Sequence, residues 1–171
     1  MLDLKRIIRI REENNHMTII KKQLQKVNKY YQALKEYKEF IETVGFKFSV
    51  DEFNYLNTPQ KAVLEAYLKR FSSLQDYLGA KVFRGLLDMA GISYRKMSEV
   101  LTLIEKEEIV SLDRWIEFRN IRNELEHDYP DELEEALRDL QYCVDSFDYM
   151  EEVVLKVFEF ARRYDESISL P

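Results

Sequence analysis

The chain has 171 residues, of which 46% are hydrophobic and 34% are charged, and its formal net charge is −6. This length and apolar content allow one sizeable core, so we expect a single domain. No apolar run approaches the roughly 18 residues of a membrane span, and the first residues lack the apolar core of a signal peptide. The one cysteine, Cys143, excludes an intrachain disulfide. We therefore expect a cytoplasmic protein with no membrane partner.

The first 38 residues carry a basic excess, with ten Lys or Arg against four Asp or Glu. Their net charge is therefore +6, and the remainder of the chain must carry −12. We interpret residues 1–57 as a basic N-terminal helical extension and residues 58–165 as the core of the domain. The extension either grips RNA or docks on an acidic surface; in the alternative interpretation, its lysines lie on a solvated helix face.

The extension has helical periodicity. Apolar residues recur at alternating steps of three and four over residues 17–41, which predicts a long helix with a heptad seam. We expect a weak point at Asn14–Asn15, ahead of this seam, and a stop at Gly45. A capping box over residues 49–52 predicts the start of a short helix.

The apolar spacing predicts a central core helix over residues 59–90, with Thr58 as its cap and Gly91 at its end. Gly79 and Gly85 lie inside this helix, where each costs about 1 kcal/mol relative to alanine. We expect close helix contacts to compensate for that cost.

Three more helices complete the prediction. One covers residues 94–107, the second begins at the cap Ser111, and the last runs from residue 131 to about residue 164. The chain has only four glycines and three prolines, a composition that favours long helices joined by short loops. The predicted fold class is therefore all-α, an up-and-down bundle of four or five main helices.

The richest polar run extends over residues 119–129 and includes Arg119, Arg122, Asn123 and His127. Arginine presents a planar cationic fork that fits phosphate oxygens. Histidine exchanges a proton near neutral pH, and asparagine both donates and accepts hydrogen bonds. This combination suits cleavage of RNA without a metal.

The spacing of these residues constrains the geometry. Arg119, Asn123 and His127 form one stripe on a helix, whereas Arg122 and His127 are offset by roughly 140°. A straight helix would hold this last pair poorly around one atom. We expect the helix to end at His127, which Pro130 favours, and a second copy of the chain to complete the site in a homodimer. The alternative interpretation is a solvated helix face with an ordinary i, i+4 ion pair.

Residues 122–129 (Arg-Asn-Glu-Leu-Glu-His-Asp-Tyr) resemble the Arg-x4-His-x-Tyr signature of the HEPN superfamily. The likeness is greatest to its HepT-like toxins and the related nucleotidyltransferase substrate-binding proteins. Residues 70–77 resemble an earlier helix of those proteins in which Arg-Phe and an acidic residue recur. Residues 109–115 resemble their short link with a tryptophan. The resemblance covers residues from about 60 to 160.

The resemblance implies a small helical bundle that dimerises and, in many members, a metal-independent endoribonuclease. It implies that Arg122 and His127 are catalytic, and we assign supporting polar roles to Asn123 and Arg119. Such toxins are usually encoded beside a minimal nucleotidyltransferase antitoxin that silences them. In the HepT-like branch, this partner attaches AMP to the tyrosine that corresponds to Tyr129.

Three hypotheses follow. The first is an endoribonuclease toxin of a toxin–antitoxin pair, acting on RNA with neither metal nor cofactor and neutralised by a nucleotidyltransferase. The second is a non-catalytic helical partner of a nucleotidyltransferase, which docks through its last helix and Tyr129. The third is a helical scaffold in which the polar run is only a helix end. The sequence contains no Gly-rich phosphate loop, serine nucleophile elbow or zinc pattern.

Overall fold

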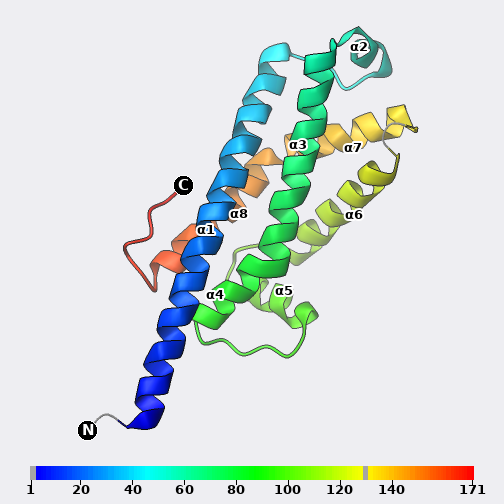
Figure 1. Ribbon diagram of the computed structural model, residues 1–171. Coiled ribbons are helices and arrows are strands. Elements are labelled where there is room, and N and C mark those ends of the chain that lie inside the picture. Colours follow the sequence, from blue (N-terminus) through cyan, green and yellow to red (C-terminus); the bar gives the residue numbers. More distant parts are fainter. Residues whose placement is uncertain (1–2, 129–130) are drawn as a thin grey trace.

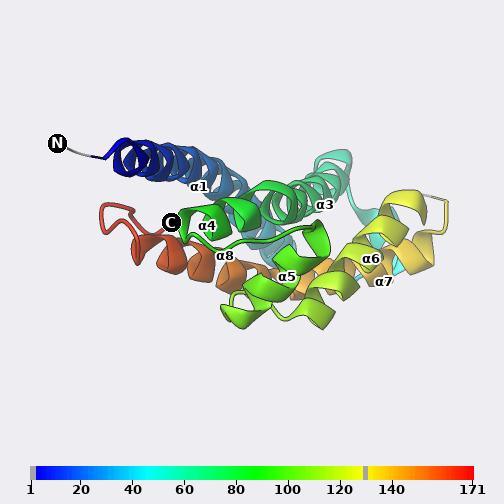
Figure 2. The same ribbon diagram turned by 90° about the horizontal axis from the view of Figure 1, so that it is seen from below.

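The computed structural model describes residues 3–128 and 131–171, and these residues form helices with no β-strand among them. The all-α prediction is therefore confirmed for the described chain, and the helices pack as a bundle (Figure 1). In chain order the elements are α1 Leu4–Val44, α2 Val50–Tyr55, α3 Thr58–Tyr77, the π-helical turn η1 Leu78–Val82, α4 Phe83–Met89, α5 Met97–Lys106, α6 Leu112–Asp128, α7 Leu133–Asp145 and α8 Phe147–Arg162. Seen from below, α1, α3 and α4 form one layer and α5 to α8 a second (Figure 2). None of the described helices has the length and apolar character needed to cross a membrane.

Helix α1 is 41 residues long and contributes the predicted seam to the core. The expected weak point at Asn14–Asn15 is wrong, because the helix begins at Leu4 and continues through both asparagines. Once a packed segment has formed a helix, adding residues to its end requires no new nucleation. Each asparagine lowers helix stability by less than about 1 kcal/mol relative to alanine. Gly45 ends the helix as predicted, with a φ of 64°. The buried seam residues are Ile20, Leu24, Val27, Tyr31, Leu34 and Ile41.

The start of α1 extends beyond the rest of the bundle (Figure 1). Every residue from 3 to 15 is exposed, including Leu4, Ile7, Ile8 and Ile10. The remainder of the helix belongs to the same hydrophobic cluster as α3, α6 and α8. The basic N-terminal segment thus divides into an exposed start and a part that builds the core.

The predicted central helix is present, but the π-helical turn η1 divides it into α3 and α4. Its cap is Asn57 and not Thr58 as expected. The Asn57 side chain accepts the Gln60 N–H at 2.9 Å, and the Gln60 side chain accepts the Asn57 N–H at 2.9 Å. This reciprocal box satisfies two backbone amides at once, which a cap at Thr58 does not offer.

The two glycines of this helix differ in what surrounds them. A Cβ at Gly85 would overlap the Gln23 side chain and lie 3.2 Å from Cδ1 of Ile20, so α4 and α1 touch there as expected. A Cβ at Gly79 would lie 3.8 Å from the Trp115 ring, which is ordinary contact. Only Gly85 is therefore required by close helix packing.

The single last helix expected from residue 131 to about 164 is wrong, because the chain forms α7 and α8 with a break at Ser146. Ser146 has a ψ of 5° and is buried between the two helices. Aspartate and serine at residues 145–146 favour helix ends over helix interiors. The break lets α7 pack against α6 while α8 packs against α1 and α4.

Aromatic side chains join the layers at the centre of the core. The Phe71 ring contacts the rings of Tyr67 and Phe118, with centroids 6.1 and 6.0 Å away. The Tyr67 hydroxyl donates a hydrogen bond to the Cys143 carbonyl at 2.9 Å. Burial raises the pKa of Tyr67 well above its usual value, so this phenol stays protonated and acts as a donor.

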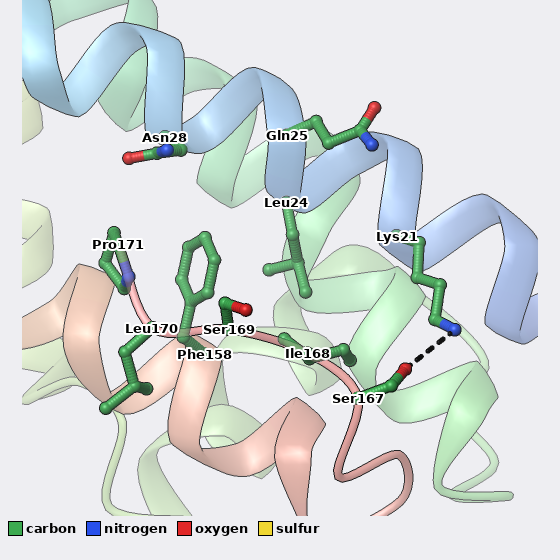
Figure 3. A pocket seen from close by; sticks show the side chains of 10 residues that line it. All are labelled: Lys21, Leu24, Gln25, Asn28, Phe158, Ser167, Ile168, Ser169, Leu170 and Pro171. Atoms are coloured by element: carbon green, nitrogen blue, oxygen red, sulfur yellow. Dashed lines mark hydrogen bonds between the residues drawn. The ribbon is translucent and has the colours of Figure 1, made fainter.

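The C-terminal segment folds back over α1 (Figure 3). The Lys21 ammonium lies 2.5 Å from the Asp165 carboxylate and donates to the Ser167 hydroxyl at 3.2 Å. Hydrogen bonds from these two residues lower the pKa of Asp165 to about 2. Ile168 is buried, and the segment borders a cavity of about 380 Å³ with Phe158 of α8.

Candidate functional site

Helix α6 carries the predicted site, and its buried stripe contains a charged residue. Trp115, Phe118, Arg122 and Leu125 are all buried, at successive spacings of three, four and three residues. Arg122 is 6% exposed. A guanidinium in such a position needs partners inside the protein, because an unpaired buried charge is costly.

The Arg122 guanidinium is held from both sides. Its Nη1 lies 2.5 Å from Oδ1 of Asp76 on α3 and 3.4 Å from the Ser72 carbonyl. Its Nη2 donates to Oδ1 of the neighbouring Asn123 at 2.8 Å. The two predicted residues Arg122 and Asn123 are therefore brought together, and a residue from 46 positions earlier completes the arrangement.

The ion pair is exposed on its acidic side. The Arg122 side chain is 7% exposed, whereas that of Asp76 is 66% exposed. Two nearby polar atoms, Nε of Arg122 and Oγ of Ser72, are buried without a hydrogen-bond partner. Because the carboxylate reaches water, another anion can compete for the guanidinium from the solvent side. The alternative interpretation of Arg122 as part of a solvated helix face is wrong.

The other predicted residues lie on the surface. Arg119, Asn123 and His127 are exposed and share one stripe of α6 by their spacing. His127 lies in the last turn of the helix, which ends at Asp128, one residue beyond the predicted end. Within residues 3–128 and 131–171, no hydrogen bond or ion pair joins His127 to Arg122. Tyr129 lies outside the described residues.

Two clefts flank the Arg122 pair, and Asp76 borders both. One has a volume of about 350 Å³ and follows the exposed face of α3 past Lys69 and Ser72. The other, of about 620 Å³, lies between α3, η1, α5 and α6 and includes Arg119. The pair is thus accessible from clefts that place further polar groups beside it.

Phenols near α6 do not offer a second proton-exchanging group. Burial and a hydrogen bond to Glu117 raise the pKa of Tyr142 to about 12. Burial also raises the pKa of Tyr149, whose hydroxyl accepts the Ser111 N–H at 3.1 Å. Both phenols therefore stay protonated at neutral pH, which leaves His127 as the candidate on this helix.

Among the described residues, no group of three or more His, Cys, Asp or Glu side chains is placed to hold a metal ion.

No protein-family model, curated protein or solved structure matches the chain. The resemblance to HEPN proteins therefore depends on the motif residues themselves.

Sequence reasoning missed the polar residues of α3 that meet Arg122. Asp76 lies in the segment 70–77, where the resemblance already pointed to an acidic residue, but nothing there identified its partner. Ser72 is 6% exposed, although serine is usually found at the surface. Its spacing from Asp76 was the available signal, since the two residues are four apart on one helix face.

Proposed function

We propose that this chain is a HEPN-type toxin, a metal-independent endoribonuclease that a nucleotidyltransferase partner neutralises. The observation that carries the proposal is the buried Arg122, whose fork is held by Asp76 and Asn123 on the helix that also presents His127. The all-helical bundle is compatible with that superfamily. A scaffold whose polar run is only a helix end gives no reason for an arginine in the core stripe.

In the proposed reaction, His127 either removes the proton from a ribose 2′-hydroxyl while water protonates the leaving 5′-oxygen, or protonates that oxygen while water takes the 2′ proton. The 2′-oxygen forms a bond to phosphorus while the bond to the 5′-oxygen breaks. Arg122 stabilises the negative charge on the phosphorane. The products are a 2′,3′-cyclic phosphate and a 5′-hydroxyl, and Asn123 and Arg119 hold neighbouring polar groups of the RNA.

In this proposal, the Asp76 carboxylate binds the Arg122 guanidinium when no RNA is present, in the position that we assign to the substrate phosphate. The carboxylate occupies the Arg122 fork at 2.5 Å, yet 66% of the Asp76 side chain is exposed. An RNA phosphate can replace it, anion for anion, while the carboxylate moves into water. The guanidinium is thus kept oriented between turnovers.

The proposed active form is a homodimer built around α6. Arg122 points to α3 of its own chain, and its offset of roughly 140° from His127 directs the histidine elsewhere. His127 of a second copy then completes each site. If so, mixing Arg122→Ala with His127→Ala chains restores cleavage through one intact site per heterodimer. Heterodimers that form but recover no activity would contradict this arrangement.

The test of the nuclease is expression without any partner. Growth arrest with cleavage of total RNA is expected for the wild type and for His16→Ala, which alters the only other histidine. His127→Ala is expected to grow normally with intact RNA. The purified protein should yield 2′,3′-cyclic phosphate ends in the presence of chelators. Intact RNA at stoichiometric wild-type protein would refute the proposal.

A second candidate is a non-catalytic partner of a nucleotidyltransferase, which docks through the C-terminal helices and Tyr129. It is favoured by the contacts of Arg122, because Asp76, Asn123 and the Ser72 carbonyl satisfy the guanidinium without His127. This role predicts a complex with a nucleotidyltransferase encoded beside this gene that survives His127→Ala. It also predicts AMP transfer that Tyr129→Phe abolishes and no toxicity of the chain alone.

A further inference from the structure

The larger cleft beside Arg122 has the features of a built pocket. Its volume is about 620 Å³, and most of its wall is apolar. The π-helical turn η1, α5 and α6 each contribute to it. Among the residues that line it are Gly79, Ala80, Met97, Leu101, Trp115 and Arg119.

The wall at η1 is left open. Gly79 has no steric need to be glycine, because a Cβ there would make ordinary contact with Trp115 at 3.8 Å. Glycine inside a helix lowers stability, and Gly85, by contrast, is required by the contact with α1. Gly79 therefore leaves this part of the pocket wall without a side chain. π-Helical turns inside α-helices also occur frequently at functional sites.

The polar residues that line the pocket are Gln75, Asp76, Ser98, Thr102 and Arg119. Gln75 is 3% exposed; its Nε2 donates to the Trp115 carbonyl at 3.3 Å, but its Oε1 is buried without a partner. Arg119 is exposed, and no carboxylate in the described chain forms an ion pair with it. A fitting ligand therefore has an apolar planar body and carries an anionic group.

We infer that this pocket binds the base of an unpaired nucleotide, with the adjoining phosphate on Arg119. Planar bases pack their faces against apolar walls without regard to sequence. Asp76 borders the pocket and pairs with Arg122, so the bound base lies next to the proposed point of cleavage.

This inference rests on the proposed nuclease function, because that function makes single-stranded RNA the source of the bound nucleotide. A free nucleotide has the same chemistry, so both must be compared. The chain contains a single tryptophan, and it lines the pocket. Tryptophan fluorescence and calorimetry of the full chain therefore report binding independently of catalysis.

The experiment titrates the protein with AMP, with ribose 5-phosphate, which lacks a base, and with a short uncleavable 2′-O-methyl oligonucleotide. We expect saturable binding of AMP and tighter binding of the oligonucleotide, but none of ribose 5-phosphate. Gly79→Leu should weaken binding about tenfold or more by filling the pocket, whereas the matched control Gly79→Ala should not. Arg119→Gln, at an exposed position, should also weaken binding about tenfold.

Several outcomes would overturn the inference. They are the absence of saturable binding, equal affinity in Gly79→Leu and Gly79→Ala, or RNA cleavage by Gly79→Leu with an unchanged KM. AMP that binds as tightly as the oligonucleotide would refute RNA as the source. Base-dependent binding by a wild type that never cleaves RNA would refute the nuclease but not the pocket, so the two failures are distinguishable.

Discussion

The Arg122–Asp76 pair predicts that removing its exposed member destabilises the protein more than removing its buried member. Asp76→Ala leaves a guanidinium that is 7% exposed, with only two neutral acceptors, the Ser72 carbonyl and the Asn123 side chain. Breaking a buried pair in this way costs about 3–5 kcal/mol. Because the two acceptors remain, we expect a loss of about 2–3 kcal/mol.

The reverse change has a smaller expected cost. Arg122→Met leaves Asp76, whose side chain is 66% exposed, so water solvates the freed carboxylate. The methionine fills much of the vacated volume in the core stripe. The variant loses a screened ion pair and the hydrogen bonds to the Ser72 carbonyl and Asn123. We therefore expect its stability to fall by about 1 kcal/mol.

The assay is urea unfolding at pH 7 of the wild type, both single variants and the double variant. The double variant should match Arg122→Met within about 0.5 kcal/mol, because no charge is left buried in either. Glu124→Ala, at an exposed position on the same helix, is the control and should change stability by less than about 0.5 kcal/mol. A greater loss in Arg122→Met than in Asp76→Ala would refute the reasoning.

Three further predictions concern the scaffold. Tyr67→Phe removes the donor to the buried Cys143 carbonyl and should cost about 1–3 kcal/mol in urea unfolding; an unchanged midpoint would contradict it. Gly85→Val forces a branched side chain into α1 and should cost about 1–3 kcal/mol in the same assay, so an equally stable variant would disprove that contact. The lowered pKa of Asp165, about 2 against 3.8, means that its stabilisation of the C-terminal segment is present above pH 3.8 and lost as the pH falls through 2. Amide exchange in that segment should therefore accelerate over this range in the wild type but depend less on pH in Lys21→Gln.

Periodicity predicted much of the helical architecture because helix formation depends on neighbours three and four residues away. The seam of α1 and the stop at Gly45 are as expected. The cap of α3 was misplaced and the break between α7 and α8 was missed, because both depend on contacts that periodicity does not describe. The cap of α3 is Asn57 because it forms a reciprocal box, and the break at Ser146 lets two faces pack against different helices.

The sequence by itself determined the all-helical class and the grouping of Arg119, Arg122, Asn123 and His127 on one helix, since both follow from local spacing. Only the tertiary structure decided which of them is buried. It placed Arg122 in the core stripe and the other three on the surface. It also supplied Asp76 from 46 residues earlier. Spacing along one helix contains no information about which side chain the neighbouring helix brings to it, because that depends on how the two helices pack.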